Sequence, residues 1–66
     1  MYLNQIRLWK KDIYPQPSIR IGEYFIIIGM NYNIAYPYCT IRYLNDGKVE
    51  TTFLKRIDLD SYNTEN

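Results

Sequence analysis

Apolar and polar positions divide the chain into short runs separated by turn-forming residues. The longest apolar run, Tyr24–Met30, is rich in aromatic and β-branched residues, which are typical of strands. Residues 19–23 (Ile-Arg-Ile-Gly-Glu) alternate just before it, and the pattern predicts a strand there as well. Because residues 24–30 are apolar on both faces, this strand is either buried on both sides or presents its outer face to a partner.

The second half of the chain predicts a hairpin. Residues 38–44 and 48–54 flank Asn45-Asp46-Gly47, a strong turn signal. A two-residue loop would pair apolar with polar residues, whereas a three-residue loop closed by Gly47 sorts them onto separate faces. The pairs expected from a three-residue loop are Tyr43–Val49, Ile41–Thr51, Cys39–Phe53, Arg42–Glu50 and Thr40–Thr52.

The two ends of the chain give weaker patterns. Residues 1–14 form either a strand, in which Ile6 and Leu8 alternate with Arg7, or a helix, and we favour the strand. Two prolines make residues 15–18 a break. Residues 57–59 (Ile-Asp-Leu) predict a last short strand, and the polar residues 61–66 are expected to fray.

The composition favours an all-β fold. Eight tyrosines, two phenylalanines and many isoleucines are strand formers, and 66 residues make one domain near the lower size limit for a core-stabilised fold. The domain is divided into an N-terminal strand or arm (1–14), a barrel (19–60) and a frayed tail (61–66). The frequency of Ile, Tyr, Asn and Lys is typical of an AT-rich genome, such as that of a low-GC bacterium or its phage.

The order of the predicted pieces resembles a small SH3-like barrel of the Tudor and KOW type. The resemblance rests on residues 19–23 as a "hydrophobic-x-hydrophobic-Gly-acid" opening, a long loop, the hairpin at Tyr43–Gly47 and a closing strand after residues 55–56. It covers residues 19–60 and implies a five-stranded barrel. The N-terminal segment lies outside this pattern and is expected to be an extra strand covering an edge of the barrel.

The residue types exclude most catalytic and metal sites. The chain has no histidine and a single cysteine, Cys39, so it has neither a histidine-activated nucleophile nor a thiolate zinc site. Its glycines form no phosphate-binding loop. We therefore expect a non-enzymatic protein without cofactor or metal. A single cysteine rules out an internal disulfide, and no signal peptide or membrane span is apparent, so a cytoplasmic protein is predicted.

Aromatic residues are the first candidates for binding. Residues 31–37 form a loop that carries tyrosines where polar side chains are usual. The resemblance implies an aromatic cage in this loop region, and the alternative is that the rings cap a small core. The predicted protein-binding residues are Tyr32, Tyr36, Tyr38 and Trp9. Trp9 is either core packing or an exposed anchor for a partner or a homodimer.

Basic residues give the alternative, a nucleic-acid-binding barrel. The residues that would contact the phosphates are Arg42, Lys48, Lys55 and Arg56, with the aromatic rings stacking on bases. The net charge of +1 argues against this function, because nucleic-acid-binding proteins usually have a clear basic excess. The sequence therefore favours an adaptor or inhibitor that engages a protein partner.

Overall fold

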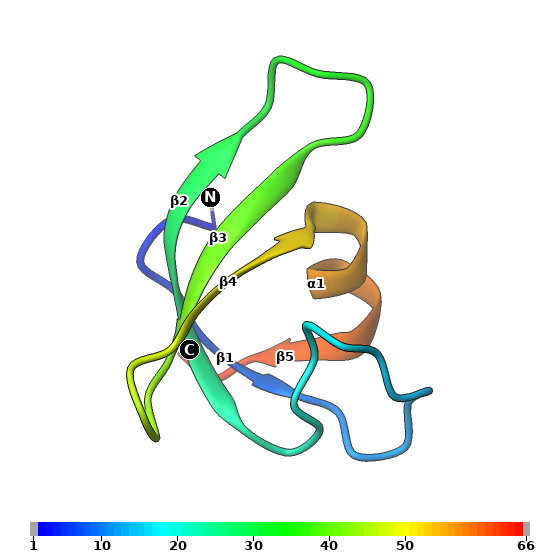
Figure 1. Cartoon of the computed structure of the whole chain (residues 1–66), viewed down its shortest axis with the longest axis vertical. Coiled ribbons are helices and arrows are strands. Elements are labelled where there is room, and N and C mark those ends of the chain that lie inside the picture. Colours follow the sequence, from blue (N-terminus) through cyan, green and yellow to red (C-terminus); the bar gives the residue numbers. More distant parts are fainter. Residues whose placement is uncertain (1, 66) are drawn as a thin grey trace.

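The computed structural model describes residues 2–65, which form five strands, one short helix and a single antiparallel sheet (Figure 1). The strand order across the sheet is β4-β3-β2-β1-β5. The elements in chain order are β1 (Ile6–Trp9), β2 (Tyr24–Asn31), β3 (Tyr38–Tyr43), β4 (Val49–Phe53), α1 (Leu54–Asp60) and β5 (Ser61–Asn63). The all-β prediction is confirmed.

The N-terminal segment forms a strand inside the sheet. Leu8 of β1 lies opposite Tyr24 of β2 on one side and Tyr62 of β5 on the other. Residues 6–9 are therefore a strand, as the alternation of Ile6 and Leu8 around Arg7 predicts. The strand does not cover an edge, because the two edges of the sheet are β4 and β5.

The predicted strand at residues 19–23 is wrong. This segment forms turns, and β2 begins only at Tyr24. Gly22 has φ +76°, a left-handed conformation that glycine adopts without strain. The Gly22 N–H donates to the Trp9 carbonyl and the Glu23 N–H to the Arg20 carbonyl, both at 3.1 Å. The alternating pattern of residues 19–23 thus reflects one buried side chain, Ile19, on a turn.

The C-terminal prediction is also wrong. Residues 57–59 belong to α1, whose Ile57 is fully buried and whose Leu54 packs against the core one helical turn earlier. Leu59, the second apolar residue of the predicted strand, is exposed. The last strand is instead Ser61–Asn63, which pairs with β1 and lies within the segment expected to fray.

The β3–β4 hairpin has a four-residue loop, not the predicted three-residue loop. The Tyr43 N–H donates to the Lys48 carbonyl at 2.9 Å, so residues 44–47 form the loop. Gly47 adopts φ +74°, and Asp46 accepts the Lys48 N–H at 3.0 Å. The observed pairs are Arg42–Val49, Ile41–Glu50, Thr40–Thr51, Cys39–Thr52 and Tyr38–Phe53. The hydrogen bonds of the loop and the positive φ of Gly47, rather than the separation of apolar from polar side chains, set the register of the hairpin. The edge strand β4 therefore buries Thr52 and exposes Val49 and Phe53.

The core lies on the inner face of the sheet, under α1 and the 10–23 loop. Its buried side chains are Trp9, Ile19, Phe25, Ile27, Cys39, Ile41, Tyr43 and Ile57. The rings of Trp9 and Phe25 stack with their centroids 4.6 Å apart, and Phe25 meets Tyr43 edge-on at 6.3 Å. These aromatic contacts join β1, β2 and β3.

Arg7 explains why the polar β5 pairs with β1. Its guanidinium is buried and donates to the Ser61 hydroxyl at 2.8 Å and to the Ser61 carbonyl at 3.1 Å. A further bond at 3.4 Å reaches the Ile57 carbonyl in the last turn of α1. Desolvation lowers the pKa of Arg7, but its hydrogen bonds hold the helix end and β5 against β1.

Candidate functional site

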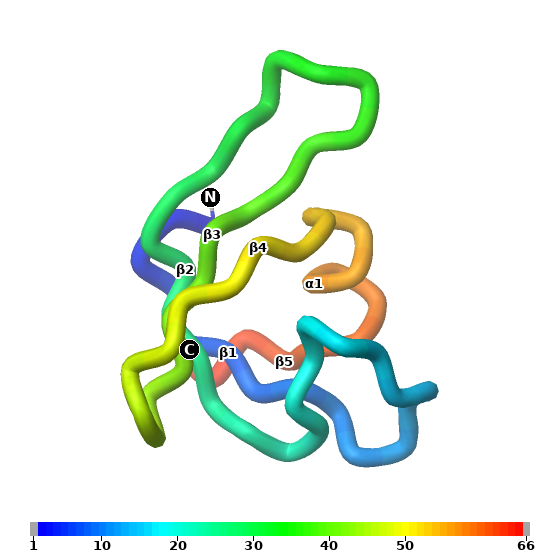
Figure 2. The backbone as a smooth tube through the Cα atoms, in the orientation of Figure 1, coloured from blue at the N-terminus to red at the C-terminus, as the bar shows by residue number. Residues whose placement is uncertain are grey.

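The 32–37 loop between β2 and β3 extends beyond the rest of the molecule (Figures 1 and 2). Tyr32 is 54% exposed and Tyr36 76% exposed, so this loop presents rings to solvent as predicted. Tyr38, at the start of β3, is half-buried and accepts a hydrogen bond from the Asn31 side chain at 3.3 Å. Tyr36 alone of these three lines a hollow beside the start of α1.

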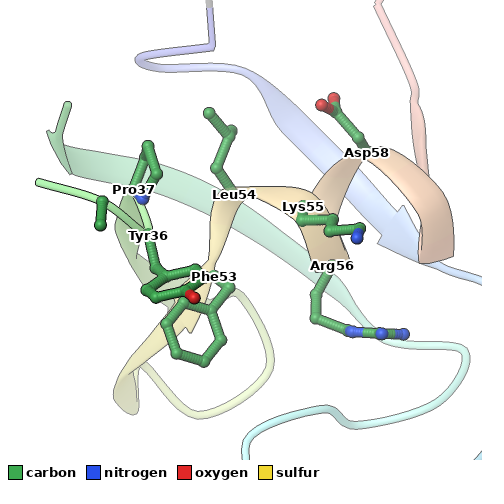
Figure 3. A pocket seen from close by; sticks show the side chains of 8 residues that line it. Tyr36, Pro37, Phe53, Leu54, Lys55, Arg56 and Asp58 are labelled. Carbon is green, nitrogen blue, oxygen red and sulfur yellow. The ribbon is translucent and has the colours of Figure 1, made fainter.

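That hollow is a groove of about 470 Å³ between the loop and the start of α1 (Figure 3). The Leu54 N–H donates to the Pro37 carbonyl at 3.0 Å, which ties its two walls together. Its lining residues are Ala35, Tyr36, Pro37, Phe53, Leu54, Lys55, Arg56 and Asp58. We call it the Tyr36–Phe53 groove, because these two rings lie together on one side of it.

Phe53 was missed at the sequence level. The expected pairing with Cys39 placed its ring in the core, whereas the observed register turns it outward, 56% exposed. The sequence shows that residue 53 is a large apolar residue in a strand. Which face of the sheet its side chain occupies depends on the length of the hairpin loop. Leu54, Pro37 and Ala35 are likewise lining residues that no motif indicated.

The charged groups at the groove are not equivalent. The Arg56 guanidinium donates to the Asp60 carboxylate at 3.0 Å, and Asp58 accepts the Tyr2 hydroxyl. That hydrogen bond is the main cause that raises the pKa of Tyr2. Lys55 is exposed and forms no ion pair within residues 2–65, so its ammonium group is available to solvent.

The basic residues predicted for nucleic acid do not form one surface. Arg42 lies on the outer face of the sheet opposite Val49, and Lys48 pairs with Glu50 at 3.4 Å near the hairpin loop. Lys48 and Lys55 flank β4 at opposite ends, up to about 23 Å apart along an extended strand. Only Lys55 and Arg56 come together with the aromatic rings.

Trp9 is not an exposed anchor. Its ring is fully buried against Phe25, and its indole N–H donates to the Tyr43 hydroxyl at 3.1 Å. The alternative interpretation at the sequence level, core packing, is therefore the observed one. In this fold Trp9 cannot contact a partner directly.

Within residues 2–65 no group of three or more acidic or cysteine side chains is placed to hold a metal ion. Burial raises the pKa of the Cys39 thiol, which disfavours the reactive thiolate. No helix in the described part of the chain is long and apolar enough to cross a membrane.

Comparison with protein-family models, with curated proteins and with solved structures finds no match. The site is a largely apolar groove with two exposed rings and one cation without an ion pair among the described residues.

Proposed function

We propose that this protein is a non-catalytic binding domain that engages a protein partner through the Tyr36–Phe53 groove. The observation that carries the proposal is the pair of exposed rings, 76% and 56% accessible, beside a groove of about 470 Å³. Large aromatic side chains in a hollow dominate the binding energy of protein interfaces. A protein of this size would act as an adaptor or as an inhibitor that covers a partner's surface, in the cytoplasm.

The chemistry of the groove defines the partner segment. Apolar walls formed by Tyr36, Pro37 and Phe53 fit an apolar or aromatic side chain. The unpaired Lys55 fits a carboxylate next to that side chain, since charge complementarity steers encounter and fixes register. The proposed partner segment therefore combines an apolar anchor with an adjacent acidic residue.

A distant SH3-like relationship is part of the proposal. The β3–β4 hairpin, the short connection through α1 and a closing strand beside β1 support it. The turn at residues 19–23 counts against it, because the resemblance assigned a strand to that motif. The closing strand is also displaced, to Ser61–Asn63.

Affinity capture from a lysate of the source cells tests the groove. The immobilised wild type is compared with the double variant Tyr36→Ala/Phe53→Ala and with Tyr14→Ala, which removes an 85% exposed ring elsewhere. We expect the double variant to lose the captured partner and Tyr14→Ala to retain it. Capture that survives in the double variant would exclude the groove as the binding site.

Lys55→Glu tests the charge of the same site. Capture should weaken by about tenfold or more if the partner presents a carboxylate there. Titration of labelled single- and double-stranded oligonucleotides, at low and near-physiological salt, tests the alternative function. Salt-sensitive binding that Lys55→Glu abolishes would replace the protein partner with nucleic acid.

A further inference from the structure

Two rows of outward side chains on the outer face of the sheet, opposite the core, are mostly apolar, where most antiparallel sheets present polar groups to water. The register sets these two rows across the strands, next to a polar row that contains Thr51 and Thr40. The first row runs Leu44, Tyr24, Leu8, Tyr62, and the second runs Val49, Arg42, Ile26, Ile6. We call these eight residues, with the neighbouring bulge residue Ile28, the outer-face patch.

The patch is accessible. Leu44 and Tyr24 are 50% exposed, Val49 is 51% exposed and Tyr62 is 55% exposed. Ile28, the extra residue where β2 bulges against β3, is 38% exposed. Ile6, Leu8 and Ile26, in the middle of the patch, are partly buried. The core, which includes Ile57 of α1 and Ile19 of the 10–23 loop, lies on the opposite face of the sheet.

Its area suits one small protein interface. At about 100 Å² for each half-exposed large side chain, the patch exposes on the order of 500 Å². Ordinary monomers rarely exceed about 300–600 Å² in one apolar patch, and such patches are often functional. Each partner in a standard interface buries about 800 Å², of which about 65% is apolar in homodimers. The patch therefore supplies the apolar part of one half of a homodimer interface.

The patch carries one charge, Arg42, which a second copy of the same face has to accommodate. Arg42 is the only charged residue in the two rows and forms no ion pair within residues 2–65. A two-fold axis over β2 would place each Arg42 one strand away from the axis, on opposite sides. The two guanidinium groups would then lie about 10 Å apart, where their stems cover apolar surface and their planes can stack on tyrosine rings.

We propose that two copies of this chain pack their outer-face patches together about a two-fold axis over β2. The patch is centred on β2 and β1. The Phe53 ring of the groove points to the same side of the sheet, but it lies at the opposite end of β4 from Val49, four residues or about 13 Å along the strand. The dimer therefore leaves the groove open and does not depend on the proposed function. A 66-residue domain also gains stability from burying this surface.

Sedimentation equilibrium from about 10 μM to about 1 mM protein tests the dimer. The wild type should rise from a mass of 8.0 kDa toward twice that value. Tyr24→Glu should weaken dimerisation by at least about tenfold, because each interface would bury two carboxylates. The control Tyr14→Glu adds the same charge outside the patch and should dimerise as the wild type does.

A second variant distinguishes loss of the dimer from loss of the fold. Tyr62→Glu gives Lys10, whose ammonium group lies 5.2 Å from the Tyr62 ring centroid, a carboxylate partner within the monomer. It should keep the circular dichroism spectrum of the wild type and remain at 8.0 kDa. A wild type that stays at 8.0 kDa throughout overturns the proposal, as does a dimer that persists in both patch variants.

The groove variant separates the two proposals. Tyr36→Ala/Phe53→Ala should dimerise as the wild type does but lose the captured partner. Tyr24→Glu should capture the partner but fail to dimerise. A monomeric wild type whose capture of a partner is abolished by Tyr24→Glu would assign the patch to another protein and overturn the homodimer.

Discussion

Two aromatic clusters of the same residue types have opposite environments. Trp9, Phe25 and Tyr43 are fully buried in the core, whereas Tyr36 and Phe53 are 76% and 56% exposed at the groove. Tyr43 and Phe53 even belong to the same hairpin, at opposite ends of paired strands. Residue type alone therefore does not separate the aromatic residues that stabilise the fold from those available for recognition.

The tyrosine hydroxyls show what distinguishes the clusters. The Tyr43 hydroxyl accepts the Trp9 indole N–H at 3.1 Å and the Arg20 N–H at 3.0 Å, and it donates to the Ser18 carbonyl at 2.7 Å. The Tyr36 hydroxyl makes no hydrogen bond within residues 2–65. A buried hydroxyl needs hydrogen-bond partners within the protein, whereas an exposed hydroxyl is satisfied by water.

Trp9→Ala should have the largest effect. Removing this fully buried ring leaves a cavity beside Phe25 and deprives the Tyr43 hydroxyl of a donor. We expect a loss of about 3–5 kcal/mol in the free energy of unfolding, measured by urea denaturation. Phe53→Ala, at the groove, should cost less than about 1 kcal/mol. Similar losses for both variants would contradict the contrast between the clusters.

Tyr43→Phe should have an intermediate effect. It keeps the ring but leaves the Trp9 N–H, the Arg20 N–H and the Ser18 carbonyl without their partner. A loss of about 1–3 kcal/mol is expected from unsatisfied buried groups. Tyr36→Phe removes the same atom from an exposed ring and should change stability by no more than about 0.5 kcal/mol. A neutral Tyr43→Phe would show that water replaces the lost hydroxyl.

Much of the fold was predictable because strand propensity and burial agree. The apolar run at residues 24–30, the strand around Ile6 and Leu8, and the Asn45-Asp46-Gly47 turn all lie where the pattern placed them. The helix and β5 were not predictable from local pattern. Ser61 pairs with β1 because Arg7 binds it, a contact between residues 54 positions apart.

The candidate site was only partly predictable for a similar reason. Exposure of Tyr32 and Tyr36 follows from their place in a polar loop between strands. Phe53 joined the site only because the hairpin register shifted by one residue, which turns every side chain of β4 to the opposite face. Whether Trp9 lay inside or outside depended on the interior position of β1, which no local pattern specifies.

A charged side chain, Arg20, packs over a ring of the buried cluster. The Arg20 guanidinium lies 4.4 Å from the Tyr43 ring centroid and donates to the Asp46 carboxylate at 3.0 Å. The Lys48 N–H donates to the same carboxylate at 3.0 Å. The hydrogen bond from the Lys48 N–H is the largest cause that holds the pKa of Asp46 below its usual value of 3.8, and the bond from Arg20 acts in the same direction.

Asp46→Asn should therefore have the smallest effect, and one that depends on pH. Because the folded-state pKa is lowered, the ionised carboxylate stabilises the fold above its usual pKa and loses that contribution as pH falls through the folded-state value. The wild type should be more stable than the variant in urea at about pH 7, and the difference should shrink toward about pH 2. Asp12→Asn, at an exposed position, controls for the loss of one negative charge. A difference for Asp46→Asn that is equal at both pH values would show that the charge of the carboxylate is not its cause, since the wild-type carboxyl also loses that charge at low pH.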